Sequence, residues 1–185
     1  MIDDGPEALG ALANVVLHES MHATHYVDGQ TAFDETIANF VGDRLALRYL
    51  DETRGADSAA KRLYLVLEDR RKQRARAMHE AYVELAALYT SDLSREAKLV
   101  QKEIVLGRLR AETGSRRRLN NATLFEFKSY NGGFEELDAL LTACGGSFPR
   151  LIRALRRIDK SSFHEPQQRD LAKVIRPLVA ASCPG

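Results

Sequence analysis

Two long runs of helix-type hydrophobic periodicity constrain the fold of this 185-residue chain more than any other feature of its sequence. The first run, from Asp57 to Tyr89, carries apolar side chains at Leu63, Leu67, Met78, Tyr82, Leu85 and Tyr89. The second carries Ala97, Val100, Ile104 and Leu106, and ends near Gly114. Because a short polar turn (90–92) joins the two runs, the sequence predicts an antiparallel helical hairpin with arms of roughly 40 Å.

The remainder of the chain is also predicted to be helical. The 12 glycines and 5 prolines fall mostly between the predicted helices, and no segment alternates with the period of two that is typical of a strand. A first helix is predicted from Pro6 to about Tyr26. A second is predicted from Thr31 to about Leu50, opened by a capping box of Thr31 and Asp34. Its buried face is predicted to consist of Ile37, Phe40, Val41 and Leu45.

These patterns predict a mainly α protein: a helical bundle forming a single domain over residues 1–185. Within it, 1–54 form a helix pair, 57–115 the long hairpin, and 119–182 a set of short C-terminal helices. The strongly apolar stretch just before residue 18 (Leu12, Val15, Val16 and Leu17) is predicted to cross the core.

Charge and cysteine content exclude several classes of protein. Lys and Arg number 27 against 26 Asp and Glu, a near-balance that argues against nucleic acid as the partner. The uncharged run 8–17 is far shorter than the roughly 18 residues of a membrane span, and the acidic start is unlike an export signal, so the sequence alone indicates the cytoplasm. Cys144 is predicted to be a core residue and Cys183 a tail residue; pairing in an oxidising compartment is the alternative.

One motif in the first predicted helix points to chemistry. Residues 18–22 read His18-Glu19-Ser20-Met21-His22, the pattern HExxH. Residues i and i+4 of a helix share a face, so both imidazoles can reach one Zn²⁺ ion. Glu19 is placed to hold the metal's water and take its proton. The alternative is two ordinary helix histidines.

A catalytic zinc ion needs a third protein ligand, and the sequence offers two candidates. His25 lies on the same helical face as His18. Glu35, which the spacing favours, is brought over the metal if the second helix folds back on the first. Otherwise Glu35 is a solvated first-turn acid.

Two further residues are assigned supporting roles, each with a structural alternative. Asn39, one turn after Glu35, is predicted to accept the second ring N–H of a ligand histidine, or else to be a surface amide. Tyr130 is predicted to donate its hydroxyl to the oxyanion formed during carbonyl attack. The alternative for Tyr130 is a loop anchor beside the glycines that follow it.

Three stretches of the sequence resemble the core of a bacterial family of predicted aminopeptidases, zinc peptidases of the gluzincin type. They are residues 16–22 (VLHESMH), 26–27 with 31–42 (YV and TAFDETIANFVG), and 119–124 (LNNATL). Tyr130 and the following Phe134-Glu135 resemble the family's tyrosine and FE pair. The resemblance covers about residues 8–160 and is most specific around residues 16–42.

The resemblance implies that His18, His22 and Glu35 bind zinc and that Glu19 is the general base. Asp34 stands where the family usually has asparagine, which adds a charge close to the metal. The implied function is a zinc metallopeptidase, an aminopeptidase-like hydrolase acting on a peptide or amino-acyl substrate, and the implied location is the cell envelope. Two alternatives stay open: a zinc-binding helical scaffold protein without a substrate cleft, or a zinc hydrolase of a non-peptide bond.

Overall fold

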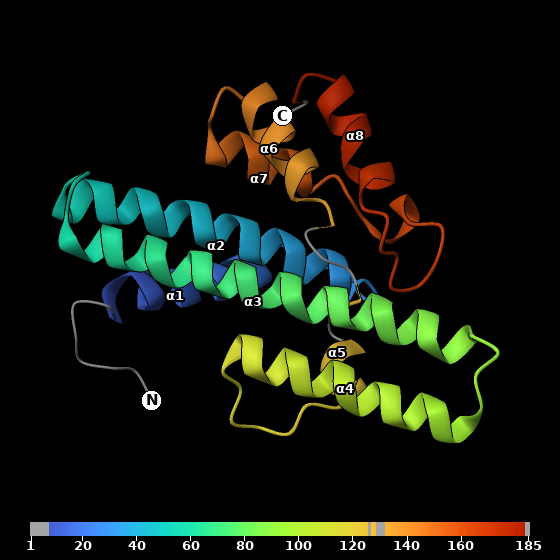
Figure 1. The fold of residues 1–185 in the computed structure, drawn as a ribbon. Helices are drawn as coiled ribbons and strands as arrows, with labels where there is room; N and C mark the ends of the chain where they lie inside the picture. The colour runs from blue at the N-terminus through green and yellow to red at the C-terminus, as the bar shows by residue number, and fades with distance from the viewer. Residues whose placement is uncertain (1–7, 126, 129–131, 184–185) are drawn as a thin grey trace. The chain divides into compact units, whose positions relative to one another are not determined.

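The computed structural model describes residues 8–125, 127–128 and 132–183, and this part of the chain is helical without any strand. The four longer helices are α1 (Ala8–Thr24), α2 (Thr31–Arg54), α3 (Ala59–Thr90) and α4 (Arg95–Thr113). Shorter elements follow: α5 (Asn121–Phe125), α6 (Phe134–Ala143), α7 (Phe148–Leu155), the 3₁₀ turn η1 (Lys160–Ser162) and α8 (Ala172–Ala180). The mainly α prediction is therefore confirmed (Figure 1). None of these helices combines the length and the apolar composition needed to span a membrane.

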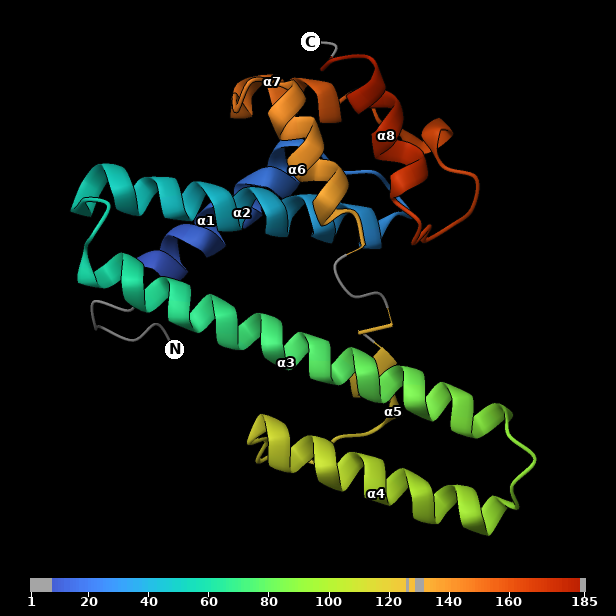
Figure 2. The same cartoon turned by 45° about the horizontal axis from the view of Figure 1, so that its top comes forward.

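The chain divides into two compact units, each with its own core. Unit 1 comprises Met1–Leu65 and Asn131–Gly185, and unit 2 comprises Val66–Tyr130. In unit 1, α6, α7 and α8 gather on one side of α2 (Figure 2). Their shared core contains side chains with no exposed surface, among them Phe33, Ile37, Phe40, Leu137, Leu140, Leu151, Leu155 and Ile175. The predicted buried face of α2 is confirmed, with Leu45 only partly buried.

A second, smaller cluster of unit 1 joins α1 to α2 and to the start of α3. Leu50 and Tyr64 are buried, with Leu17 packed against them. Asn14 adds a polar link, since its Nδ2 donates to Asp43 Oδ1 (2.7 Å) and to the hydroxyl of Tyr64 (2.8 Å). These contacts fix the helix that carries the HExxH motif.

Unit 2 contains most of α3, α4 and α5, with α3 and α4 running side by side as a hairpin (Figures 1 and 2). Its core is formed by Ala77, Met78, Ala81, Leu85, Val105, Leu106, Leu109, Leu119 and Leu124. Val100 and Ile104, two of the apolar residues that define the second predicted run, are both exposed. Because α4 is apolar on two faces, periodicity alone did not distinguish the stripe containing Val105 and Leu109 that packs inward.

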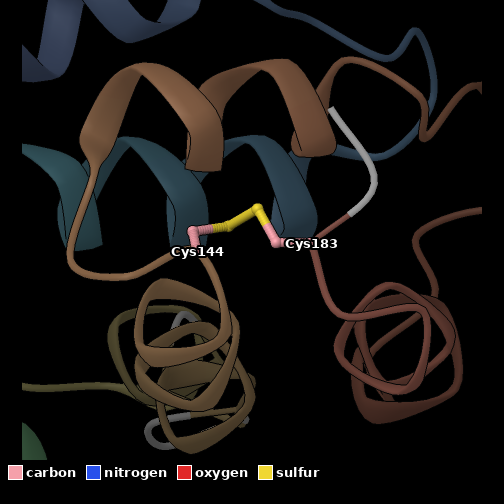
Figure 3. Close-up of a disulfide and its surroundings, with 2 residues drawn as sticks. All are labelled: Cys144 and Cys183. Carbon is pink, nitrogen blue, oxygen red and sulfur yellow. A yellow bond between two sulfur atoms is a disulfide. The ribbon is translucent and has the colours of Figure 1, made fainter.

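Three local predictions also need correction. No side chain caps α2: its N-cap is Gln30, and Thr31 is the first helical residue. Leu12, Val15 and Val16 do not cross the core but are exposed, because α1 packs on α2 through its opposite side. Cys183 is a buried residue rather than a free tail residue, and it forms a disulfide with Cys144 at the end of α6 (Figure 3).

Candidate metal centre

The HExxH residues occupy the last two turns of α1, where helical spacing places the two imidazoles one above the other. The rings of His18 and His22 meet edge to face, with centroids 4.8 Å apart. Their Nε2 atoms are 3.1 Å apart and therefore point at the same region of space. This convergence is what a pair of helix-borne metal ligands requires.

Glu35, in the second turn of α2, brings a carboxylate to the same place. Its Oε2 lies 3.6 Å from His18 Nε2, and its Oε1 lies 3.5 Å from His22 Nε2. The segment between the helices is held by hydrogen bonds from Gln30 Nε2 to the carbonyl of Glu165 (2.8 Å) and from the Gln168 N–H to Gln30 Oε1 (2.9 Å). Since these bonds fix the start of α2, they also fix the position of Glu35.

The three side chains are close enough together to bind one metal ion. Ligands at 2.0–2.1 Å from a tetrahedral zinc ion lie about 3.3 Å from one another. His18 Nε2 and His22 Nε2 are 3.1 Å apart, and the nearest Glu35 oxygen to each lies at 3.6 Å (Oε2) and 3.5 Å (Oε1). With one ligand atom taken from each residue, the three atoms lie within 4.8 Å of one another. Two imidazoles and one carboxylate are also a donor set that suits zinc better than Mg²⁺ or Ca²⁺, which prefer oxygen ligands.

The side chains of His18, His22 and Glu35, which we call the donor group, are accessible from solvent. The side chains of His18 and His22 are 17% and 22% exposed, whereas that of Glu35 is 52% exposed. Three ligands on one side and solvent on the other would leave one position open for water or substrate, as in a catalytic rather than a structural zinc site.

Close packing of α1 on α2 supports this geometry at Gly42. A Cβ atom on Gly42 would lie 3.1 Å from the carbonyl oxygen of Asn14 and 3.3 Å from the Cβ of His18. The absence of a side chain at this position therefore allows α2 to approach the backbone of the metal-site helix.

Glu19 differs from the three clustered residues in its surroundings. It is exposed, and its carboxylate forms no ion pair or hydrogen bond with any described residue. An exposed carboxylate next to a candidate metal ligand is accessible to water, as a general base must be.

Asp34 lies beside Glu35 but points into the protein. Its side chain is buried, and its Oδ1 accepts a hydrogen bond from the backbone N–H of Val27 (2.9 Å). Its Oδ2 is buried without a hydrogen-bond partner in the described structure. Burial raises the pKa of Asp34, although the Val27 N–H and the neighbouring His22 oppose the shift. Asp34 is therefore an internal group of the site and is unavailable to bind a substrate's ammonium group.

The other predicted site residues lie apart from the donor group. His25 is not part of the donor group, and its ring packs against that of Phe33 with the ring centroids 6.1 Å apart. Burial, with a contribution from Arg156, lowers the pKa of His25. Asn39 is half-buried on α2 and makes no side-chain hydrogen bond with the described residues. Tyr130 lies outside the described residues.

Sequence reasoning missed the exposed apolar surface around Glu19, because an apolar run was assigned to the core. The signal was present in the spacing: Leu12, Val15 and Val16 precede Glu19 by seven, four and three residues. Those intervals place the three residues on the same helix face as Glu19. This face must be exposed to solvent if Glu19 is a general base.

Fold and donor group together define a helical protein with a His–His–Glu cluster presented by two consecutive helices. The family model described as "Putative aminopeptidase" matches residues 6–170, and the chain belongs to this family. No curated protein and no solved structure gave a significant match.

Proposed function

We propose that this protein is a zinc-dependent peptidase with aminopeptidase-like activity. The proposal rests on the convergence of His18, His22 and Glu35, which each place one ligand atom within 4.8 Å of the other two. The family description supports an aminopeptidase. With glutamate as the third ligand, the site would be of the gluzincin type.

The chain's own residues would divide the chemistry between them. The two imidazoles and the Glu35 carboxylate would hold zinc, which supplies a Lewis acid for the substrate carbonyl and lowers the pKa of water. Glu19 would accept a proton from the attacking water and return it to the leaving amine as the C–N bond breaks. Tyr130 keeps its proposed role of stabilising the oxyanion. Asn39 makes no side-chain hydrogen bond with the described residues, so no contact supports its predicted role of orienting a ligand histidine.

The proposal is tested with three matched substrates: an aminoacyl amide, its N-acetylated form and the corresponding ester. The zinc-loaded protein is compared with Glu19→Gln, and Glu112→Gln on α4 serves as a carboxylate control. We expect cleavage of the amide, with loss of about 10²- to 10⁴-fold in rate for Glu19→Gln and no loss for the control. An absence of Glu19-dependent amide cleavage in zinc-loaded protein would contradict a peptidase.

N-acetylation and the ester discriminate between kinds of hydrolase. Loss of cleavage on acetylation would identify an aminopeptidase, and unchanged cleavage an endopeptidase. Cleavage of the ester alone would identify a hydrolase of a non-peptide bond. Zinc binding without Glu19-dependent cleavage of any substrate would identify a scaffold protein.

We also propose that the protein works in an oxidising compartment such as the cell envelope. The support is the disulfide between Cys144 and Cys183, two buried residues whose Cα atoms are 5.0 Å apart. Disulfides form and persist in such compartments and are rare in the cytosol. Mass spectrometry after thiol alkylation of protein isolated from its native source tests this, because a fully alkylated chain would contradict the proposal.

A further inference from the structure

The exposed face of α1 is apolar around Glu19. Leu12, Val15 and Val16 are 40%, 56% and 54% exposed, and Tyr26, just after the helix, is 59% exposed. Ala23, one turn after Glu19, is exposed as well. We call these five residues the α1 apolar strip. Glu19 lies within it, and His18 and His22 lie at its edge.

The opposite side of α1 is closed to any ligand. Met21 is buried, and Asn14 and His18 are in close contact with the Gly42 position of α2. The strip is therefore an exposed apolar surface of α1 from which a bound molecule can reach both the donor group and Glu19.

The strip also differs in charge from an ordinary exposed helix face. Glu19 is the only Asp, Glu, Lys or Arg residue in α1. Covering Leu, Val and Tyr side chains with a ligand stabilises the complex by about 25 cal/mol per Å² of apolar surface that is removed from water. A charged ligand group placed there would lose hydration without gaining a partner.

We propose that the α1 apolar strip is the surface on which the substrate's side chains next to the scissile bond bind. The substrate class is then peptides with bulky, uncharged apolar residues at that bond. This inference rests on the proposed peptidase function, since it takes the donor group and Glu19 as the reacting centre. It adds a selectivity that the donor group alone does not supply.

The test measures binding rather than turnover. Zinc-loaded Glu19→Gln protein is titrated with two fluorescent peptides that differ only in carrying Leu or Lys at the central position, and anisotropy is recorded. The Gln variant prevents cleavage and removes a carboxylate that would attract lysine. We expect the Leu peptide to bind at least tenfold more tightly than the Lys peptide.

Variants of the strip identify where the preference originates. In the same background, Val15→Ser and Val16→Ser are each expected to reduce the Leu/Lys affinity ratio by about fivefold. Leu99→Ser, at an equally exposed apolar position on α4, is expected to leave the ratio unchanged. Circular dichroism verifies that each variant is folded.

Two outcomes would overturn the inference: an affinity ratio that neither strip variant changes, or a concentration-dependent dimer that Val15→Ser dissociates. The second would show that another copy of the chain covers the strip. Failure of the proposed function is separate, because it is read from zinc content and Glu19-dependent cleavage. If amides are cleaved without selectivity for apolar residues, only the inference about the strip fails.

Discussion

The α1–α2 pair and the α3–α4 hairpin are both built from consecutive helices joined by short connections, but they bury different kinds of side chain. In unit 1, Gln30, Asp34, Asp43 and Gln168 are buried together with the apolar core. In the described part of unit 2, no polar or charged side chain is buried. Buried polar groups are costly, and they are retained where they position other groups.

Several of these polar groups hold the connection that leads to Glu35. Asp34 holds the connection between α1 and α2, and Gln30 ties that connection to residues 165 and 168. Unit 2 lacks any comparable polar framework among its described residues, and its stability comes from apolar packing. Among the described residues, buried polar side chains are therefore confined to unit 1, which also carries the candidate metal site.

The largest expected effect on stability comes from the disulfide, which belongs to unit 1. Its cysteines are 39 residues apart, and a cross-link closing a loop of that length stabilises a fold by roughly 4 kcal/mol in the chain-entropy model. The double variant Cys144→Ala with Cys183→Ala should therefore destabilise unit 1. Hydrogen exchange should accelerate in residues 132–183 and remain unchanged in 66–125. Equal acceleration in both segments would show that the units do not unfold separately.

Truncating a core side chain of unit 2 tests the converse case, in which unit 2 is destabilised and unit 1 is not. Leu106 is almost completely buried between α3 and α4, and Leu106→Ala should cost about 3 kcal/mol through lost burial and a residual cavity. Exchange should accelerate in residues 66–125, and zinc content should stay unchanged. A loss of zinc in this variant would contradict the assignment of the site to unit 1 alone.

Alanine substitutions at one glycine in each helix pair test how closely the helices of that pair are packed. Nothing lies within 4 Å of a Cβ built on Gly107 of α4, so Gly107→Ala should stabilise the protein by about 1 kcal/mol through helix propensity. Gly42→Ala gains the same propensity but presses on Asn14 and His18. Chemical denaturation should show no gain for Gly42→Ala, and calorimetry should show weaker zinc binding. Equal stabilisation by both changes would mean that α1 and α2 are not tightly packed.

The smallest effect is expected at Asp34. Because burial raises its pKa, the folded state holds the Asp34 proton more tightly than the unfolded state does, and the charged form reduces stability at neutral pH. Asp34→Asn keeps an acceptor for the Val27 N–H and should modestly raise the free energy of unfolding at pH 7. The gain should shrink as the pH falls, because the wild type then becomes protonated. A variant that is less stable than wild type at pH 7 would contradict this account.

The sequence was most informative where one periodicity acted alone. Helix positions in the first half of the chain and the convergence of His18, His22 and Glu35 follow from 3.6-residue spacing and a short connection. The sequence was least informative where a helix is apolar on two faces, as at Val15 and Ile104. Burial there depends on which of the two faces packs against another helix. The cysteine pairing depends on how α6 and α8 fold together, which spacing along the chain does not encode.

Metal analysis of purified, zinc-loaded protein measures directly whether His18, His22 and Glu35 bind zinc. We expect one zinc ion per chain for the wild type, for Glu19→Gln and for the control Glu112→Gln. We expect loss of most of the zinc in His22→Ala and Glu35→Gln, because each removes a ligand. A wild type that binds no zinc would contradict the account, and so would Glu35→Gln with full zinc content beside a His25→Ala variant that has lost it.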